Sequence, residues 1–369
     1  MRKWFTVEAT VIIMCWGSCV QFEFTEEQKM IRTMADEFAR DHGGSERIRA
    51  AMASSLGYDT ETWLSLGELG LAGLLIGTDQ GGQGLGPVEM ALVHEALGRY
   101  LISGPMLASG VIAATFLAGL KSQELTLMQS MASGELRVAL ARFADGQSLF
   151  VLDAHHADCL LACVDDAAYI VYRNEAGEFP GIAVERLTML DQTRVLSHLN
   201  MVELTPDAQK LSEGREVTQA YQDGLAMGRL ATAAEAVGAA QTSLMRTVEY
   251  AQEREQFGRK IGSFQALKHE LANVMVNTEA AISAVYFAAC TAAESPDALD
   301  QMAALARVQA SEALTHAAGR MIQLHGGIGF TWEHDAHLYF KRARGTATLF
   351  GSNASLDEAI AASILGDAA

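Results

Sequence analysis

The C-terminal part of the chain, from about residue 214, constrains the fold most, because its apolar residues recur with the spacing of a helix. These apolar positions lie three, four or seven residues apart: Leu230, Ala234, Val237, Leu244, Val248 and Ala251. Alanine is dense further on, with 14 of the 40 residues between 281 and 320, and small side chains let helices pack closely. Proline, which breaks helix interiors, occurs only 5 times in 369 residues. The pattern predicts a C-terminal helical domain of the four-helix type over residues 214–369.

Helical patterns also dominate the N-terminal part. Thr25 and Gln28 have the spacing of a capping box, with two glutamates in the first turn between them. Apolar residues with helical spacing follow in three segments: 30–38, 63–71 and 88–100. We therefore expect an N-terminal helical domain over residues 22–133.

The segment between these helical parts has a sequence pattern typical of strands. Its apolar runs have the length of strands: Leu136–Arg142, Cys159–Val164, Ala168–Arg173 and Leu199–Leu204. Turn-forming residues separate these runs, as at Asp145-Gly146 and Asn174–Gly177. We expect a small middle β-domain over residues 134–208, so the predicted fold class is α+β, mostly α, in the order α–β–α.

Charge and cysteine content exclude several classes of protein. The 45 acidic residues outnumber the 27 basic ones, giving a net charge of −18, whereas nucleic acids and anionic membranes attract a basic face. The 5 cysteines are an odd and low number, which favours a reduced cytoplasmic interior over a disulfide scaffold. No stretch approaches the roughly 20 apolar residues of a membrane span. We predict a cytoplasmic protein without a nucleic-acid partner or a membrane span.

The first residues precede every strong helical signal, and we interpret residues 1–21 as a disordered extension. Arg2 and Lys3 stand before a short apolar run, Val11–Met14, which gives the outline of a signal peptide. Glu8 interrupts that outline and no small-residue cleavage site follows, so the signal peptide is the less favoured alternative.

Two further motifs have ordinary structural interpretations. The glycine-rich loop 81–86 follows no buried strand and lacks the Lys-Ser/Thr ending of a phosphate loop, so we expect a turn between helices. A group of zinc-type ligands lies nearby in sequence: His155, His156, Asp158, Cys159 and Cys163. Cysteines four apart in a strand lie about 13 Å from each other, too far for one zinc ion. We expect no metal site.

Two C-terminal segments contain residues suited to ligand contact. Residues 254–260 hold three cations in an otherwise acidic protein, which fits either a phosphate site or a solvated loop. Residues 323–330 contain three glycines, which fit either close approach of the backbone to a ligand or the end of a helix.

Together, Arg254–Gly262 with Phe264-Gln265 and Gln323–Phe330 resemble the two C-terminal signatures of the acyl-CoA dehydrogenase family. Three N-terminal segments resemble the first helical domain of that family: 63–70, 81–85 and 95–99. The resemblance covers about residues 22–365. It implies an acyl-CoA dehydrogenase-like fold and an oxidoreductase that binds FAD and an acyl-CoA thioester. In the family a Glu removes the α-proton while flavin N5 takes the β-hydride, and an electron-transfer flavoprotein commonly accepts the electrons.

The resemblance also implies which residues contact the cofactor. In the family, the arginine loop and the glycine segment reach across a subunit interface and hold the adenosine-pyrophosphate part of the neighbour's FAD. Carried over to this sequence, the cofactor-binding residues are Arg254, Phe257, Gln323, Gly326 and Gly327.

The sequence departs from the family at the chain's own catalytic site. The family's Thr-Glu-Pro…Gly-Ser-Asp segment is replaced by Ala139–Asp145. Phe350, or Gly351 if the gap moves, stands at the usual position of the catalytic Glu, and Gly228 stands at the alternative position on the long helix. None of these can accept a proton. The sequence thus resembles the base-lacking subunits of heteromeric bacterial acyl-CoA dehydrogenases, known from steroid side-chain degradation.

We expect a base-lacking subunit that completes the FAD site of a related partner subunit. One alternative is a self-sufficient acyl-CoA dehydrogenase with a displaced base. Candidates for that base are Asp223, Glu235, Glu333 and Asp335. A second alternative is a non-redox protein on the same fold that binds CoA esters or acts as a scaffold.

Overall fold

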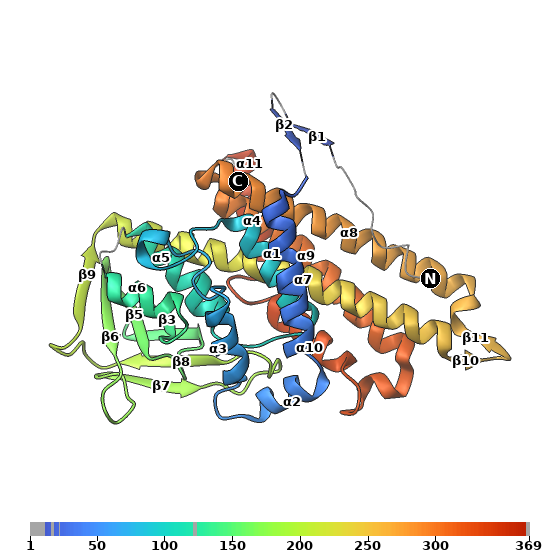
Figure 1. The fold of residues 1–369 in the computed structure, drawn as a ribbon, viewed down its shortest axis with the longest axis horizontal. Helices are drawn as coiled ribbons and strands as arrows, with labels where there is room; N and C mark the ends of the chain where they lie inside the picture. Colours follow the sequence, from blue (N-terminus) through green and yellow to red (C-terminus); the bar gives the residue numbers. More distant parts are fainter. Residues whose placement is uncertain (1–11, 16–17, 22, 121–123, 367–369) are drawn as a thin grey trace.

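The computed structural model describes residues 12–15, 18–21, 23–120 and 124–366. They form an N-terminal group of helices, a middle domain with two small sheets, and a C-terminal helical bundle (Figure 1). The sheets gather at one end of the molecule, and the long helices of the bundle extend to the other. The predicted mostly helical α+β fold, in the order α–β–α, is confirmed.

The N-terminal helices follow one another closely along the chain. They are α1 (Glu26–His42), α2 (Ser45–Ala53), α3 (Thr60–Glu68), the 3-10 helix η1 (Thr78–Gln80), α4 (Pro87–Arg99), the π-helix η2 (Met106–Ala113), α5 (Ala114–Gly119) and α6 (Leu125–Ala132). The Thr25–Gln28 capping box is present at the start of α1. The glycine-rich loop 81–86 joins η1 to α4, as expected for a turn between helices.

Part of the N-terminal extension lies within the described residues. It contains the antiparallel pair β1 (Ile12–Cys15) and β2 (Ser18–Gln21), in a segment for which we expected disorder. The rest of residues 1–22 lies outside the described residues.

The middle domain contains seven strands in two sheets. They are β3 (Val138–Phe143), β4 (Gln147–Leu152), β5 (Cys159–Val164), β6 (Ala167–Tyr172), β7 (Ile182–Arg186), β8 (Leu196–Met201) and β9 (Gln209–Glu213). One sheet has the order β3-β5-β6-β9, and the other has the order β4-β8-β7. The apolar runs correspond to β3, β5, β6 and β8, whereas β4, β7 and β9 were not predicted. Because β9 pairs with β6, the sheet extends beyond the expected boundary at residue 208.

Strand β5 is buried on both faces, which explains its unbroken apolar sequence. Cys159 and Cys163 face the helices α5, α6 and α7, and Leu160 and Ala162 face the other sheet. Burial raises the pKa of both thiols, that of Cys163 to about 12, so both stay protonated. Within the described residues, no group of three or more His, Cys, Asp or Glu side chains is placed to hold a metal ion.

The C-terminal bundle contains the longest helices. It comprises α7 (Arg215–Glu253), α8 (Gln265–Glu294), α9 (Leu299–His325), α10 (Ala336–Thr346) and α11 (Asn353–Leu365). Short elements join them: the two-residue strands β10 (Glu255–Gln256) and β11 (Arg259–Lys260), and the 3-10 helices η3 (Ile261–Ser263), η4 (Pro296–Ala298) and η5 (Gly326–Phe330). Helix α7 packs against α9 and α4, so it joins the bundle to the N-terminal helices.

Helices α4 and α7 cross at a point where only glycine fits. A Cβ on Gly98 would lie 2.1 Å from the carbonyl oxygen of Glu235, and one on Gly238 would lie 2.0 Å from that of Glu95. The two backbones therefore touch directly, and this crossing fixes the position of Glu235 beneath the N-terminal helices.

Among the described helices, α8 alone is long and apolar enough to cross a membrane by length and composition. In this fold it packs along α9, α7 and α4. Its buried positions, including Val274, Ala281 and Val285, contribute to the main hydrophobic core. A core helix of a bundle passes the same test of length and composition, so α8 gives only weak evidence of a membrane span.

Candidate functional site

A cavity of about 360 Å³ lies between the middle domain and the C-terminal helices. Its walls come from the π-helix η2, strands β3 and β4, the loop before β8, helix α7, and the loop after α10. The lining is mainly apolar, as is usual for small-molecule sites. The π-helical turn widens the backbone beside the cavity, and such turns often occur at functional sites.

The two expected base positions lie together here: residues 350 and 351 line the cavity, and the buried Gly228 packs against Phe350. A Cβ on Gly228 would lie 3.3 Å from Cε2 of Phe350 and 2.9 Å from Cγ1 of Ile112. The fold thus brings residues 228 and 350 together, and neither carries a proton acceptor.

Two arginines hold the backbone around Phe350. Phe350 has a left-handed backbone with φ 60°, and its carbonyl accepts a hydrogen bond from Nε of Arg229 at 3.0 Å. Arg307 donates from Nη2 to the carbonyls of Leu349 and Gly351, each at 3.2 Å. Burial, with nearby Arg194 and Arg229, lowers the pKa of Arg307 to about 10, which still leaves it charged at neutral pH. These hydrogen bonds fix the aromatic ring of Phe350 at the cavity wall, at the position expected from the sequence to hold the base.

A second phenylalanine with a left-handed backbone lines the cavity from strand β4. Phe150 has φ 57° and is 58% exposed, and the register of β4 shifts between Ser148 and Val151. Strained backbone of this kind often marks functional sites. Sequence reasoning missed Phe150 because β4 was not predicted as a strand.

Residues 139–145, which stand where the sequence analysis expects the family's polar segment, place few polar side chains in the cavity. Of Ala139–Asp145, Leu140 lines the cavity. Ala139, Ala141 and Phe143 point instead into the core between the two sheets. The segment therefore presents an alkyl side chain to this space.

Three ionisable side chains line the cavity: Asp191, Arg194 and Tyr221. Asp191 is 3% exposed and accepts a hydrogen bond from Nε of Arg342 at 3.0 Å. Burial raises the pKa of Tyr221, which keeps its phenol protonated. No carboxylate that lines the cavity is free of a cationic partner.

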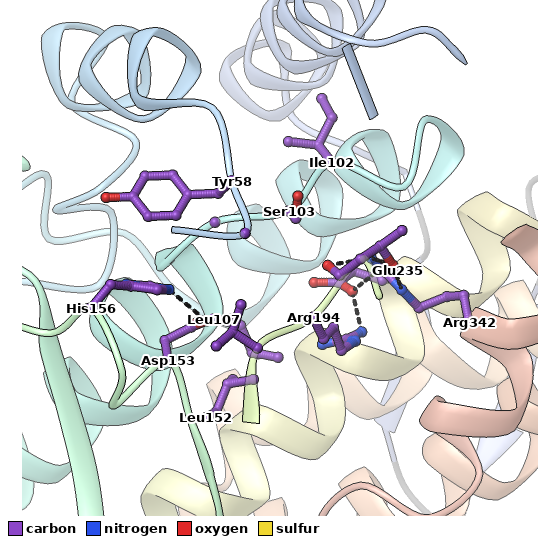
Figure 2. A pocket seen from close by; sticks show the side chains of 14 residues that line it. Tyr58, Ile102, Ser103, Leu107, Leu152, Asp153, His156, Arg194, Glu235 and Arg342 are labelled. Atoms are coloured by element: carbon purple, nitrogen blue, oxygen red, sulfur yellow. Dashed lines mark hydrogen bonds and ion pairs between the residues drawn. The ribbon is translucent and has the colours of Figure 1, made fainter. Parts of the chain in front are cut away.

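Glu235 lies beside a smaller neighbouring pocket, where Arg194 and Arg342 converge on it (Figure 2). Its Oε2 accepts from Arg194 at 2.5 Å and from Arg342 at 3.1 Å, and its Oε1 lies 3.0 Å from Nδ1 of His94. Burial raises the pKa of Glu235, but these partners outweigh that effect and lower the pKa to about 2. The carboxylate is therefore a poor proton acceptor, and it joins all three parts of the fold.

Figure 2 also shows His156 beside Asp153 across the same pocket. Nε2 of His156 lies 3.2 Å from Oδ1 of Asp153, and its ring lies 4.7 Å from the ring of Tyr58. His156, one of the zinc-type residues noted in the sequence, is buried in contact with Asp153.

The other candidates for a displaced base do not line the cavity either. Asp335 is buried among Ser45, Arg49 and Arg246. Burial raises its pKa, but these hydrogen bonds and charges outweigh the effect and lower it. Asp223 lies two residues from both cavity-lining residues of its helix, so it faces elsewhere. Glu333 is exposed.

The five residues expected to contact a partner's cofactor are all exposed, on two loops. Arg254 ends α7, and Phe257 lies at the tip of the β10–β11 turn with φ 58° and 92% exposure. Gln323, Gly326 and Gly327 lie at the end of α9. Tyr250 near the end of α7 stacks on His325 at the end of α9, with ring centroids 4.3 Å apart, so the two loops lie at the same end of the bundle.

The glycine loop leaves its backbone open to an approaching group. Gly326 has φ 63°, and a Cβ on Gly326 or Gly327 would meet no atom within 4 Å. Neither glycine is needed for packing within the chain. Exposed amides beside an arginine suit a phosphate, because both donate hydrogen bonds to an anion.

Sequence comparison matches both helical parts to one family. The acyl-CoA dehydrogenase N-terminal domain matches residues 25–135, and the acyl-CoA dehydrogenase C-terminal domain matches residues 217–365. Acyl-CoA dehydrogenase IpdE2 of Mycobacterium tuberculosis is 38% identical over 329 residues, which cover 89% of this chain and 94% of the relative.

Solved structures agree with this match. The ChsE4–ChsE5 complex from Mycobacterium tuberculosis gives a TM-score of 0.82 at 26% identity, covering 95% of this chain and all (100%) of that chain. Butyryl-CoA dehydrogenase from Megasphaera elsdenii shares the fold, with a TM-score of 0.80 at 21% identity over 94% of this chain and 100% of that chain. The chain therefore belongs to the acyl-CoA dehydrogenase family, whose FAD-dependent members are oxidoreductases acting on CH–CH bonds.

Proposed function

We propose that this chain is the base-lacking subunit of a hetero-oligomeric acyl-CoA dehydrogenase and completes the FAD site of a related partner subunit. The observation that carries the proposal is that Phe350, which lines the cavity, and Gly228, which packs against it, bring no carboxylate to this place. The exposed cofactor-type loops at the end of the bundle support the second half of the proposal.

The residues on these loops fit the adenosine-pyrophosphate part of FAD. Arg254 offers a planar guanidinium that can bind a phosphate through two hydrogen bonds. Gly326 and Gly327 let the backbone approach the diphosphate closely. Phe257 offers an exposed aromatic face for the adenine or the ribose. When bound, FAD supplies the acceptor for the β-hydride of the acyl-CoA thioester.

In this assignment the chain binds and orients, while the partner subunit supplies the carboxylate that takes the α-proton. The chain's own cavity has apolar walls and an arginine-clamped phenylalanine at the base position, so it offers no route for proton removal. Electron-transfer flavoprotein is the expected electron acceptor, and the cytoplasm is the expected compartment.

The comparisons support a heteromeric assembly. The similar ChsE4–ChsE5 structure is a complex of two named chains, and the alignment covers 95% of this chain and 100% of the matched chain. A self-sufficient enzyme has less support. Glu235 and Asp335 are ion-paired with lowered pKa values, and Asp223 and Glu333 lie away from the cavity lining.

Purification of the chain alone and together with a co-expressed related dehydrogenase subunit tests the proposal. We expect the lone chain to lack bound flavin and the co-purified pair to contain it and to reduce ferrocenium with an acyl-CoA substrate. Full flavin content and turnover by the lone chain would show a self-sufficient enzyme. Absence of flavin in the pair would favour a non-redox CoA-ester binding or scaffold protein.

A further inference from the structure

Three aromatic rings stack between the two cofactor-type loops. Tyr250 stacks on His325 at 4.3 Å with an interplanar angle of 22°, and His325 lies 4.5 Å from His334 at 42°. Tyr250 lies one helical turn before Arg254, His325 directly precedes Gly326, and His334 follows η5. We call these three rings the loop stack. It links the end of α7 to both sides of the glycine loop.

Hydrogen bonds fix the orientation of both histidines. Nδ1 of His325 lies 2.7 Å from the carbonyl oxygen of Met321, to which it donates. The amide of Ala336 donates to Nδ1 of His334 at 3.1 Å, so that nitrogen carries no proton. His334 is therefore neutral in this arrangement, and a proton placed on Nδ1 would break its bond to the start of α10.

Charged groups from three elements surround the stack. Arg246 on α7 and Arg49 on α2 both bind Asp335, which directly follows His334. His337 on α10 lies nearby, and its pKa is lowered mainly by burial and also by the charge of His334. Burial is the main cause that lowers the pKa of His325 and His334, and Arg246 lowers both further. The hydrogen bond to Met321 and the charge of Asp335 oppose this effect at His325 and His334, respectively. A proton added to the stack would lie near two arginines, and Asp335 is already shared between those arginines.

We propose that the loop stack is a positioning device that holds the arginine loop and the glycine loop as one preformed surface, and that protonation of His325 or His334 separates them. This inference rests on the proposed function only in assigning the surface to a partner's cofactor. The stack itself is a property of this chain. Preforming the surface avoids the cost of ordering two loops at the moment of binding.

The direction of the pH effect follows from the sign of the shifts. The folded chain holds the pKa of both histidines below their ordinary value of about 6.5. The unfolded or opened state then binds more protons below that value. The stabilisation is complete above about pH 6.5 and is lost as the pH falls through the folded-state pKa.

Hydrogen exchange of the lone chain, corrected for the intrinsic pH dependence of exchange, tests this inference without a partner. At about pH 7.5 we expect residues 250–264 and 323–335 to be protected, and at about pH 5 both segments should lose protection together by roughly tenfold. Separate opening of the two segments, or equal protection at both pH values, would overturn the inference.

Variants separate a positioning role from a merely structural one. His325→Phe keeps a ring in the stack but removes its titration, so protection should stay high and depend less on pH. His334→Phe removes the second titrating ring together with its hydrogen bond from Ala336, and His325→Ala should open both loops at both pH values. His316→Phe is the matched control, because His316 lies on the same helix, is bonded to Asn277 and has no contact with the stack. Because either histidine can separate the loops when protonated, undiminished pH sensitivity in the chain that carries both Phe substitutions would overturn the inference.

Flavin retention by the co-purified pair distinguishes this inference from the proposed function. If the exchange results hold and flavin release follows the same pH profile, both stand. If the exchange results hold but flavin retention ignores pH and the His325→Ala substitution, the loop stack stands and the cofactor assignment of the surface fails.

Discussion

A phenyl ring has no lone pair to accept a proton, and glycine has no side chain at all. Neither residue can act as a base, although the fold brings the two together: Phe350 lines the cavity and Gly228 packs against it. Glu235, two helical turns after the helix position, is engaged in ion pairs instead. Whether this chain can itself remove the α-proton therefore depends on single residues.

At the residue scale, Glu235 is expected to be a structural anion. Glu235→Gln leaves Arg194 and Arg342 buried beside a neutral partner, which should lower the free energy of unfolding by about 3–5 kcal/mol. Urea denaturation followed by circular dichroism measures the loss. Glu333→Gln, at an exposed carboxylate, is the control and should change stability by less than about 0.5 kcal/mol. Equal effects of the two substitutions would contradict this role.

The same residue predicts a pH dependence of stability. The pKa of Glu235 in the folded chain is about 2, below its unfolded value of about 4.3. Its contribution is complete above the unfolded pKa and is lost as the pH falls through the folded pKa. The free energy of unfolding should therefore decline between about pH 4.5 and pH 2, and Glu235→Gln should decline less steeply. Identical profiles for the two proteins would be inconsistent with this assignment.

Arg254 is the residue whose loss should affect cofactor binding most specifically. Arg254→Ala removes a charge-assisted contact worth about 1.5–3 kcal/mol, so the co-purified pair should bind FAD roughly 10- to 100-fold more weakly. Arg40→Ala, at an exposed arginine on α1, is the matched control. Flavin fluorescence after dilution measures the release, and unchanged retention in Arg254→Ala would remove Arg254 from the site.

At the element scale, the sequence predicted the elements whose local signals are strong. The Thr25–Gln28 capping box and the Asp145-Gly146 turn between β3 and β4 are both present, because each is determined by a few adjacent residues. Strands β7 and β9 were missed because they carry polar side chains and gain their place by pairing with β8 and β6. Strand β4, which forms part of the cavity wall, was also not predicted, and its register is irregular.

The close crossing of α4 and α7 predicts that a larger residue at the crossing lowers stability. Gly98→Ala puts a Cβ 2.1 Å from a backbone oxygen of α7, so the helices must separate, at a cost of about 1–3 kcal/mol or more. Gly319→Ala on α9 meets no atom within 4 Å and should stabilise the chain by up to about 1 kcal/mol. Thermal unfolding of both variants checks the contrast. Similar melting temperatures for the two would argue against a tight crossing.

At the scale of the whole molecule, the site could be predicted only in part. The resemblance pointed to the two loops, which are exposed, because they are readable as local motifs; its assignment of the two base positions stays a prediction. It did not give the Glu235 network or the Arg307 clamp, because their members come from distant parts of the chain. The spacing of residues along the sequence does not predict such contacts, because they form only when the domains pack together.

The central proposal is that two unlike chains share one cofactor site and only one of them supplies the base. The number of flavins in the assembly tests it most directly. In the proposed function, this chain offers cofactor contacts to a neighbour, while its own cavity has apolar walls. Flavin absorbance against protein concentration in the purified hetero-oligomer should give one FAD for each pair of unlike chains, and none for the lone chain. One FAD for every chain, or flavin bound by this chain alone, would contradict the account.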